Sequence, residues 1–188
     1  PAAMRDWLQA SDFKGALGDI RLLPGTDGVA GAVIGHGTAT TRARGRFGLS
    51  RAATSLPSGA WHFVGLGDAF CDEAALGWLL AQYRFDRYVP GKSKAEPALL
   101  KLPAGCDEAR LLAMAEGEVL TRDLINTPAS DMGPQELEEA FCALATRHGA
   151  EAQVVRGDDL LAHNFPMIHA VGRGSDRAPR LLSMRWGT

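Results

Sequence analysis

The chain has 188 residues, of which 46% are hydrophobic and 22% are charged, and its formal net charge is −2 at pH 7. This composition is typical of a globular protein with a packed core and excludes the polar, highly charged composition of a disordered chain. The near-neutral charge provides no strongly basic face, so we expect no nucleic-acid partner.

The first half of the chain is predicted to alternate strands with a helix. Short apolar runs that end at glycine or proline predict strands at 19–25, 29–37, 61–68 and 96–105. A well-buried helix is predicted over 72–85, because Asp72 and Glu73 suit a helix start and apolar residues recur at three- and four-residue steps. This alternation predicts an α/β layer structure, with an N-terminal domain over 1–105.

A long helix is predicted next, over 107–125. Pro128 ends it, because proline disfavours the helical conformation in the residue before it and has no N–H to donate. A second helix is predicted to start at Pro134, with Gly133 as its N-cap, and to run to His148. The joint between the two helices is therefore the predicted domain boundary, and the linker helix with its joint occupies 106–133.

The rest of the chain is predicted to form a strand, a short helix and two strands. These elements are expected at 151–157, 158–164, 165–175 and 178–188, and with the preceding helix they form an αβαββ order. The last strand carries Leu181, Leu182, Met184 and Trp186, which predicts that it is buried. A buried strand needs backbone partners. We therefore expect 134–188 to be the beginning of a second α/β domain that continues beyond Thr188.

The histidines do not predict a metal site. His163 and His169 are six residues apart, a spacing that fits neither one face of a helix nor a strand with a nearby Asp or Cys. The chain contains no H-E-x-x-H motif and no C-x-x-C pair. We interpret these two residues, and also His36, His62 and His148, as packing or surface residues.

The search for a nucleophile is also negative. The chain has no G-x-S-x-G motif, and Ser50 lacks the strand–turn–helix context that would expose its hydroxyl. Cys71 begins a predicted helix, where the helix dipole could lower the pKa of its thiol. A buried, structural thiol is the ordinary role for such a cysteine. We predict no catalytic, cofactor-binding or metal-ligating residue in this chain.

Two further patterns keep alternative functions open. Glycine-rich turns follow predicted strands at 31–40, 65–68 and 171–177, and backbone amides in such turns can bind an anion, although no complete phosphate-loop motif occurs. Arg42, Arg44, Arg46 and Arg51 surround Phe47 in a segment that could contact nucleic acid. Glycine after a strand and arginine on a solvated surface are also ordinary features of α/β proteins.

Cysteine use and hydropathy predict the compartment. Cys71, Cys106 and Cys142 are 35 and 36 residues apart, an odd number of thiols without the spacing of a metal site or a disulfide framework. No apolar run approaches the roughly 20 residues that a membrane span needs, and the first ten residues lack the layout of a signal peptide. We predict a cytoplasmic protein.

Three segments resemble the leucyl, or cytosol, aminopeptidase family. The segment "TRDLINTPASDMGP" (121–134) resembles the point where the family's linker helix enters the catalytic domain. The segment "NFPMIHAVGRGSDRAPRLLSMRW" (164–186) is similar to the part that follows in the family. In the first half, "ALGWLLAQYRFDRY" (75–88) is similar to the helix that closes the family's N-terminal domain.

The resemblance implies an N-terminal domain with a macro-domain-like sheet and a catalytic domain with two divalent metals, zinc, manganese or magnesium. These metals would activate a water, polarise the peptide carbonyl and anchor the free α-amino group, so that only N-terminal residues are removed from peptides. It also implies assembly as a hexamer.

The family's metal ligands lie in a "GKG...FD.GG" segment and an "NTDAEGR" segment, and this chain contains neither. We therefore expect the chain to bind no metal and to be inactive by itself. The alternative is a nucleotide- or phosphate-binding macro-like module that uses the turns at 35–37 or 65–67.

Overall fold

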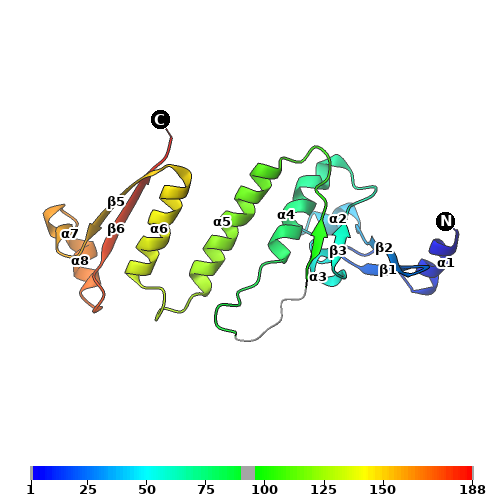
Figure 1. Cartoon of the computed structure of the whole chain (residues 1–188), viewed down its shortest axis with the longest axis horizontal. Coiled ribbons are helices and arrows are strands. Elements are labelled where there is room, and N and C mark those ends of the chain that lie inside the picture. Colours follow the sequence, from blue (N-terminus) through cyan, green and yellow to red (C-terminus); the bar gives the residue numbers. More distant parts are fainter. Residues whose placement is uncertain (1, 90–95, 188) are drawn as a thin grey trace. The chain divides into compact units, whose positions relative to one another are not determined.

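The computed structural model describes residues 2–89 and 96–187 (Figure 1). The chain divides into two compact units, Pro1–Thr121 and Arg122–Thr188. The border between them falls inside one helix, α5 (Glu108–Asn126). Division of the chain into parts at residues 105 and 133 stays a prediction.

The strands of unit 1 form small sheets. β1 (Ile20–Gly25) and β2 (Gly28–Ile34) make an antiparallel hairpin, and β3 (Gly59–Trp61) pairs in parallel with β4 (Ala98–Leu100). The strands predicted over 19–25 and 29–37 are confirmed as β1 and β2, and β4 covers three residues of the strand predicted over 96–105. The prediction over 61–68 is wrong except at Trp61, where β3 ends, because residues 62–67 form a loop. The mixed α/β class is confirmed. Within the described residues each sheet has only two strands, so a larger macro-like sheet stays a proposal.

Unit 1 also contains helices that the sequence patterns did not predict. The predicted helix over 72–85 is confirmed as α4 (Cys71–Ala81), and the long helix over 107–125 as α5. The additional elements are α1 (Ala2–Ala10), α2 (Ala39–Arg42), α3 (Ala52–Ser55) and the 3₁₀ turn η1 (Asp68–Phe70). Three of these four have only one turn, too short for a periodic apolar pattern.

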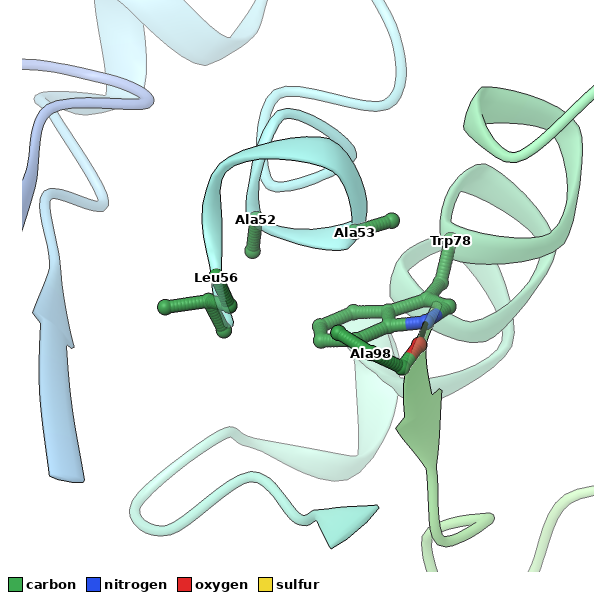
Figure 2. Packing of buried hydrophobic residues seen from close by; sticks show 5 residues of the cluster. All are labelled: Ala52, Ala53, Leu56, Trp78 and Ala98. Atoms are coloured by element: carbon green, nitrogen blue, oxygen red, sulfur yellow. Dashed lines mark hydrogen bonds between the residues drawn. The ribbon is translucent and has the colours of Figure 1, made fainter. Parts of the chain in front are cut away.

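The core of unit 1 is built around Trp78 of α4. Figure 2 shows its ring packed between α3 and β4. On the α3 side lie Ala53 and Leu56, the residue that follows this helix, and on the β4 side lies Ala98. Trp78 is only 2% exposed, and its indole N–H donates a 3.0 Å hydrogen bond to the carbonyl of Ala98. A buried tryptophan needs such an acceptor. The core therefore links α4 to the parallel strand pair, and the predicted burial of this helix is confirmed.

Unit 2 contains α6 (Pro134–His148), β5 (Glu151–Arg156), α7 (Asp159–Ala162), α8 (Pro166–Gly172) and β6 (Arg180–Arg185). β5 and β6 pair antiparallel, with Ala152 opposite Met184. Helix α6 lies on one side of this pair, and α7 and α8 lie on the other (Figure 1). The predictions for α6, β5, α7 and β6 are confirmed.

The strand predicted over 165–175 is wrong, because residues 166–172 form helix α8. Asn164 ends α7 in the left-handed conformation, with φ 63°, and Pro166 fits the first helical position. The apolar run within residues 166–172 is short, and runs of this length are compatible with either a strand or a helix. Unit 2 therefore has the order αβααβ instead of αβαββ.

The predicted burial of the last strand is correct only in part. Leu181, Leu182 and Met184 are half-buried, but Trp186 is 77% exposed. The indole N–H of Trp186 donates to the carbonyl of His148, at 3.1 Å. Within the described residues β6 pairs with β5 alone.

Candidate functional site

The joint between α5 and α6 is an ordered turn held by local hydrogen bonds. Thr127 is buried, and its N–H and hydroxyl donate to the carbonyl of Asp123 at 3.0 and 2.6 Å. The carbonyl of Pro128 accepts the N–H groups of Asp131 and Met132 at 2.8 and 2.9 Å. Pro128 thus follows the end of α5, as predicted, and its carbonyl also organises the turn.

The start of α6 has the predicted chemistry. Gly133 is the N-cap and Pro134 the first helical residue. The Glu136 carboxylate accepts the N–H of Gly133 at 2.9 Å. Backbone N–H groups, from Glu136 itself and from Gly133, lower the pKa of the Glu136 carboxyl. This interaction satisfies a backbone donor that the helix leaves without an internal partner.

Arg177 ties the joint to the turn before β6, an interaction that the sequence did not predict. Its Nη1 and Nη2 atoms donate to the carbonyls of Ala129 and Ser130 at 3.2 and 2.8 Å, and Nη1 lies 3.7 Å from the Glu136 carboxylate. A Cβ atom at Gly133 would lie 2.1 Å from Nη1 of Arg177. Glycine at this position therefore leaves the space that the guanidinium group occupies.

Glu138 joins α6 to both strands of unit 2. Arg156 and Arg180 are direct partners across the β5–β6 pair, and both donate to the carboxylate of Glu138, Arg180 through Nε at 2.5 Å. The hydrogen bonds from Arg156, assisted by the one from Arg180, lower the pKa of Glu138 to about 2. Two like charges on facing strands repel each other, so the buried carboxylate compensates them. The charge of the Glu138 carboxylate therefore holds α6 to β5 and β6, which is a structural role.

The described residues contain no group of three or more His, Cys, Asp or Glu side chains that could hold a metal ion. His169 pairs through Nε2 with Asp158 at 2.9 Å, and His36 packs edge-on against Phe70. His163 is exposed. That this chain supplies no catalytic, cofactor-binding or metal-ligating residue stays a prediction.

The other candidate nucleophiles have ordinary environments. Cys71 is buried at the start of α4, and its thiol lies 3.7 Å from the carbonyl of Gly67. Burial, with a smaller contribution from a hydrogen bond to Asp72, raises the pKa of the Cys106 thiol to about 11. A raised pKa disfavours the reactive thiolate. Ser50 donates its backbone N–H to Phe47 and is half-buried.

Unit 1 contains a cleft of about 950 Å³. It runs past β2 and β3 and brings together His36, from the first glycine-rich turn, and 65–67, from the second. Arg42 lies at the same cleft. Two glycine turns that are about thirty residues apart in the sequence therefore contribute to one site, whereas the turn at 171–177 belongs to unit 2.

The amides of the first turn are largely used within the fold. Gly35 donates its N–H to Asp19 at 2.7 Å, and Gly37 donates to Gly15 at 3.1 Å. These amides cannot also bind an anion, so the suggested backbone phosphate site at 35–37 is unsupported. By contrast, the N–H groups of 65–67 donate no hydrogen bond in the described part of the chain.

The arginine segment does not act as a single basic face. Arg42 donates to the carbonyls of His36 and Gly37 at 3.1 and 3.0 Å. Arg46 lies over the ring of Phe47, and its Nε is 3.7 Å from Glu73. Part of the charge is therefore engaged within unit 1.

Comparison with known proteins identifies the family. The "M17 aminopeptidase, N-terminal domain" model matches residues 1–103, just over half of the chain, and the "Cytosol aminopeptidase family, catalytic domain" model matches residues 119–188. The chain belongs to the cytosol aminopeptidase family. The resemblance seen in the sequence is confirmed, including the order of an N-terminal domain followed by the start of the catalytic domain.

Individual members of the cytosol aminopeptidase family agree with this assignment. A probable cytosol aminopeptidase from Corynebacterium efficiens is 29% identical over 95% of this chain and 38% of its own length. The crystal structure of cytosol aminopeptidase from Coxiella burnetii matches with a TM-score of 0.86 and 31% identity, over 100% of this chain and 40% of that one.

A second solved structure, the bottromycin maturation enzyme BotP in complex with Mn, matches with a TM-score of 0.75 and 26% identity, over 95% of this chain and 41% of BotP. The chain thus spans about two fifths of the length of each of these three proteins. Its joint and Glu138 cluster lie within the catalytic-domain match, and its cleft lies within the N-terminal match. In the described residues, no helix is both long and apolar enough to cross a membrane.

Proposed function

We propose that this chain is the N-terminal portion of a two-metal aminopeptidase that hydrolyses the N-terminal peptide bond of peptides with a free amino terminus. The observation that carries the proposal is the consecutive match to the family's N-terminal domain and to the beginning of its catalytic domain. The parent enzyme would be cytoplasmic and hexameric, as the family resemblance implies.

The metals of the parent enzyme would be two divalent ions, zinc, manganese or magnesium. Such ions supply Lewis-acid activation of a water and of the peptide carbonyl. The Mn complex of the similar enzyme BotP supports this choice of cofactor. The residues described in this chain offer no fitting ligand group, so the ligands would come from the "GKG...FD.GG" and "NTDAEGR" segments of a longer protein. We therefore propose that the 188-residue chain alone is inactive.

The role proposed for this chain is structural. The joint places the start of α6, Arg177 fixes that joint to the segment before β6, and Glu138 fastens α6 to β5 and β6. These contacts would orient the opening elements of the catalytic domain, while the N-terminal domain supports subunit assembly and shapes access to the catalytic cavity.

The proposal is tested with two purified proteins, the 188-residue chain and a longer protein that continues through both metal-ligand segments. Each is incubated with Mn²⁺ or Zn²⁺ and leucine p-nitroanilide, and N-acetyl-leucine p-nitroanilide serves as the blocked control. We expect the longer protein to release nitroaniline from the free substrate only. Failure of the longer protein would refute the aminopeptidase assignment, and turnover by the short chain within about tenfold of it, or 1.4 kcal/mol in activation free energy, would refute its inactivity.

A further inference from the structure

The cleft of unit 1 has basic side chains and no acidic side chain in its described lining. Arg42, His36 and His62 line it, and the remaining lining residues are apolar or small, apart from Ser58. Its volume of about 950 Å³ lies within the range of small-molecule sites, which is about 300–1,000 Å³. Charge complementarity therefore favours an anionic ligand of modest size.

Arg42 is held in a fixed orientation at this cleft. Both of its Nη1 hydrogen bonds go to backbone carbonyls, of His36 and Gly37, and its guanidinium group lies 5.5 Å from the centre of the Phe70 ring. Its Nε and Nη2 atoms have no acceptor among the described residues. A guanidinium fixed in this way retains donors in the planar arrangement that matches phosphate oxygens.

The second glycine turn lines the same cleft as this arginine. Phe70, which stacks against Arg42, donates its backbone N–H to the carbonyl of Gly67 at 2.9 Å. The amides of 65–67 have no acceptor within the described chain, and Gly65 has the left-handed φ of 76°. Unused backbone amides and a fixed guanidinium group in one cleft provide two kinds of donor for an anionic ligand.

Aromatic side chains also contribute to the cleft wall. Trp61 and Phe63 are half-buried, and Phe63 packs edge-on against Trp78 with ring centres 5.9 Å apart. The Trp61 ring is oriented by a 3.0 Å hydrogen bond from its N–H to the carbonyl of Pro57. Aromatic side chains provide flat apolar surfaces against which a planar ring can stack.

We propose that this cleft binds a nucleoside monophosphate, with its base against Trp61 and Phe63 and its phosphate at Arg42 and the amides of 65–67. The site lies entirely in unit 1 and is independent of peptide hydrolysis. The side-chain cation at Arg42 replaces the backbone cradle that the first glycine turn cannot provide.

The binding test uses the 188-residue chain and isothermal titration calorimetry with AMP, adenosine and inorganic phosphate. We expect AMP to bind with a Kd below about 1 mM. Adenosine and inorganic phosphate should each bind at least about tenfold more weakly than AMP. Equal affinity for AMP and adenosine would overturn the phosphate contact. Absence of AMP binding, with binding of the apolar dye ANS instead, would identify the cleft as an apolar docking surface and overturn the proposal.

Substitutions locate the binding site. Arg42→Ala should weaken AMP binding about tenfold, or 1.4 kcal/mol, whereas Arg44→Ala, at an exposed position outside the lining, should leave it unchanged. Arg42→Ala also removes a contact that holds the chain at His36. Val64 therefore provides a second pair of variants that leaves the fold undisturbed, because it lines the cleft but is 86% exposed. Val64→Asp should weaken AMP binding and Val64→Lys should preserve or strengthen it. The same affinity in both Val64 variants would contradict the site.

Discussion

Gly35 and Gly117 differ in what surrounds the position of a missing side chain. A Cβ atom at Gly35 would lie 1.9 Å from the backbone oxygen of Ala16, whereas nothing lies within 4 Å of one at Gly117. Gly35 is buried, and Gly117 is an exposed residue inside α5. The first glycine permits a close backbone approach, and the second has no such role in the described structure.

Substitution by alanine should therefore have opposite effects at these two positions. Gly35→Ala should lower the free energy of unfolding by roughly 1–3 kcal/mol, because the backbone near Ala16 must move. Gly117→Ala should raise it by about 0.5–1 kcal/mol, because alanine restricts the unfolded chain and favours the helix. Urea unfolding followed by circular dichroism measures both. A Gly35→Ala variant as stable as the unsubstituted chain would show that the backbone near Ala16 moves without a cost in free energy.

Glu138 should make the stability of unit 2 depend on acid. Its folded-state pKa of about 2 lies below the ordinary value of 4.5, so its ionised form stabilises the fold above pH 4.5. This contribution is lost as the pH falls from about 4.5 toward 2. We expect the free energy of unfolding to decrease over this window, and Glu138→Gln to show less of the decrease.

At neutral pH, Glu138→Gln should destabilise the chain by about 2 kcal/mol, because a buried charge-assisted contact to Arg156 and Arg180 is weakened. Glu139→Gln is the matched control, since Glu139 is the next residue on α6 and is exposed. Urea titrations at several pH values compare the three proteins. If the free energy of unfolding depended on pH in the same way in the unsubstituted chain and in Glu138→Gln, the assigned role of Glu138 would be contradicted.

At the scale of elements, clear start and stop residues determine how well a segment is predicted. Helix α6 has Pro134 at its start and Gly149, with φ 63°, at its end, and its predicted bounds are confirmed. The segment that forms α8 also contains a proline at its start, but its apolar run is short and glycines follow it. The repeat of apolar residues in a helix cannot be distinguished from that in a strand over so few residues, so the prediction of a strand was wrong.

Helix α7 depends on one buried side chain. Leu160 is fully buried on the side of the β5–β6 pair opposite α6, whereas its neighbour Leu161 is 50% exposed. Leu160→Ala should lower the free energy of unfolding by about 2–5 kcal/mol because it leaves a cavity. Leu161→Ala should lower it by less than about 1 kcal/mol, because a half-exposed leucine loses less buried apolar area. Equal losses in urea unfolding would show that α7 is not anchored through Leu160.

At the scale of the whole molecule, each unit has a separate internal organisation. Unit 1 packs around Trp78 and contains the cleft, and unit 2 packs α6 and α7 against the β5–β6 pair. Family membership accounts for this arrangement, since the chain corresponds to an N-terminal domain followed by the start of a catalytic domain. Peptide hydrolysis is proposed for the longer protein, and nucleotide binding for unit 1 of this chain.

The sequence by itself determined the mixed α/β class, the joint at Pro128, the bounds of α6 and the family. These features depend on caps, prolines, periodicity and short motifs, which act over a few neighbouring residues. Only the tertiary structure decided which distant groups meet: Glu138 with Arg180, 42 residues away, Arg177 with Ala129, 48 residues away, and the two glycine turns at one cleft. Such contacts arise from packing between elements, and no local pattern of residues specifies them.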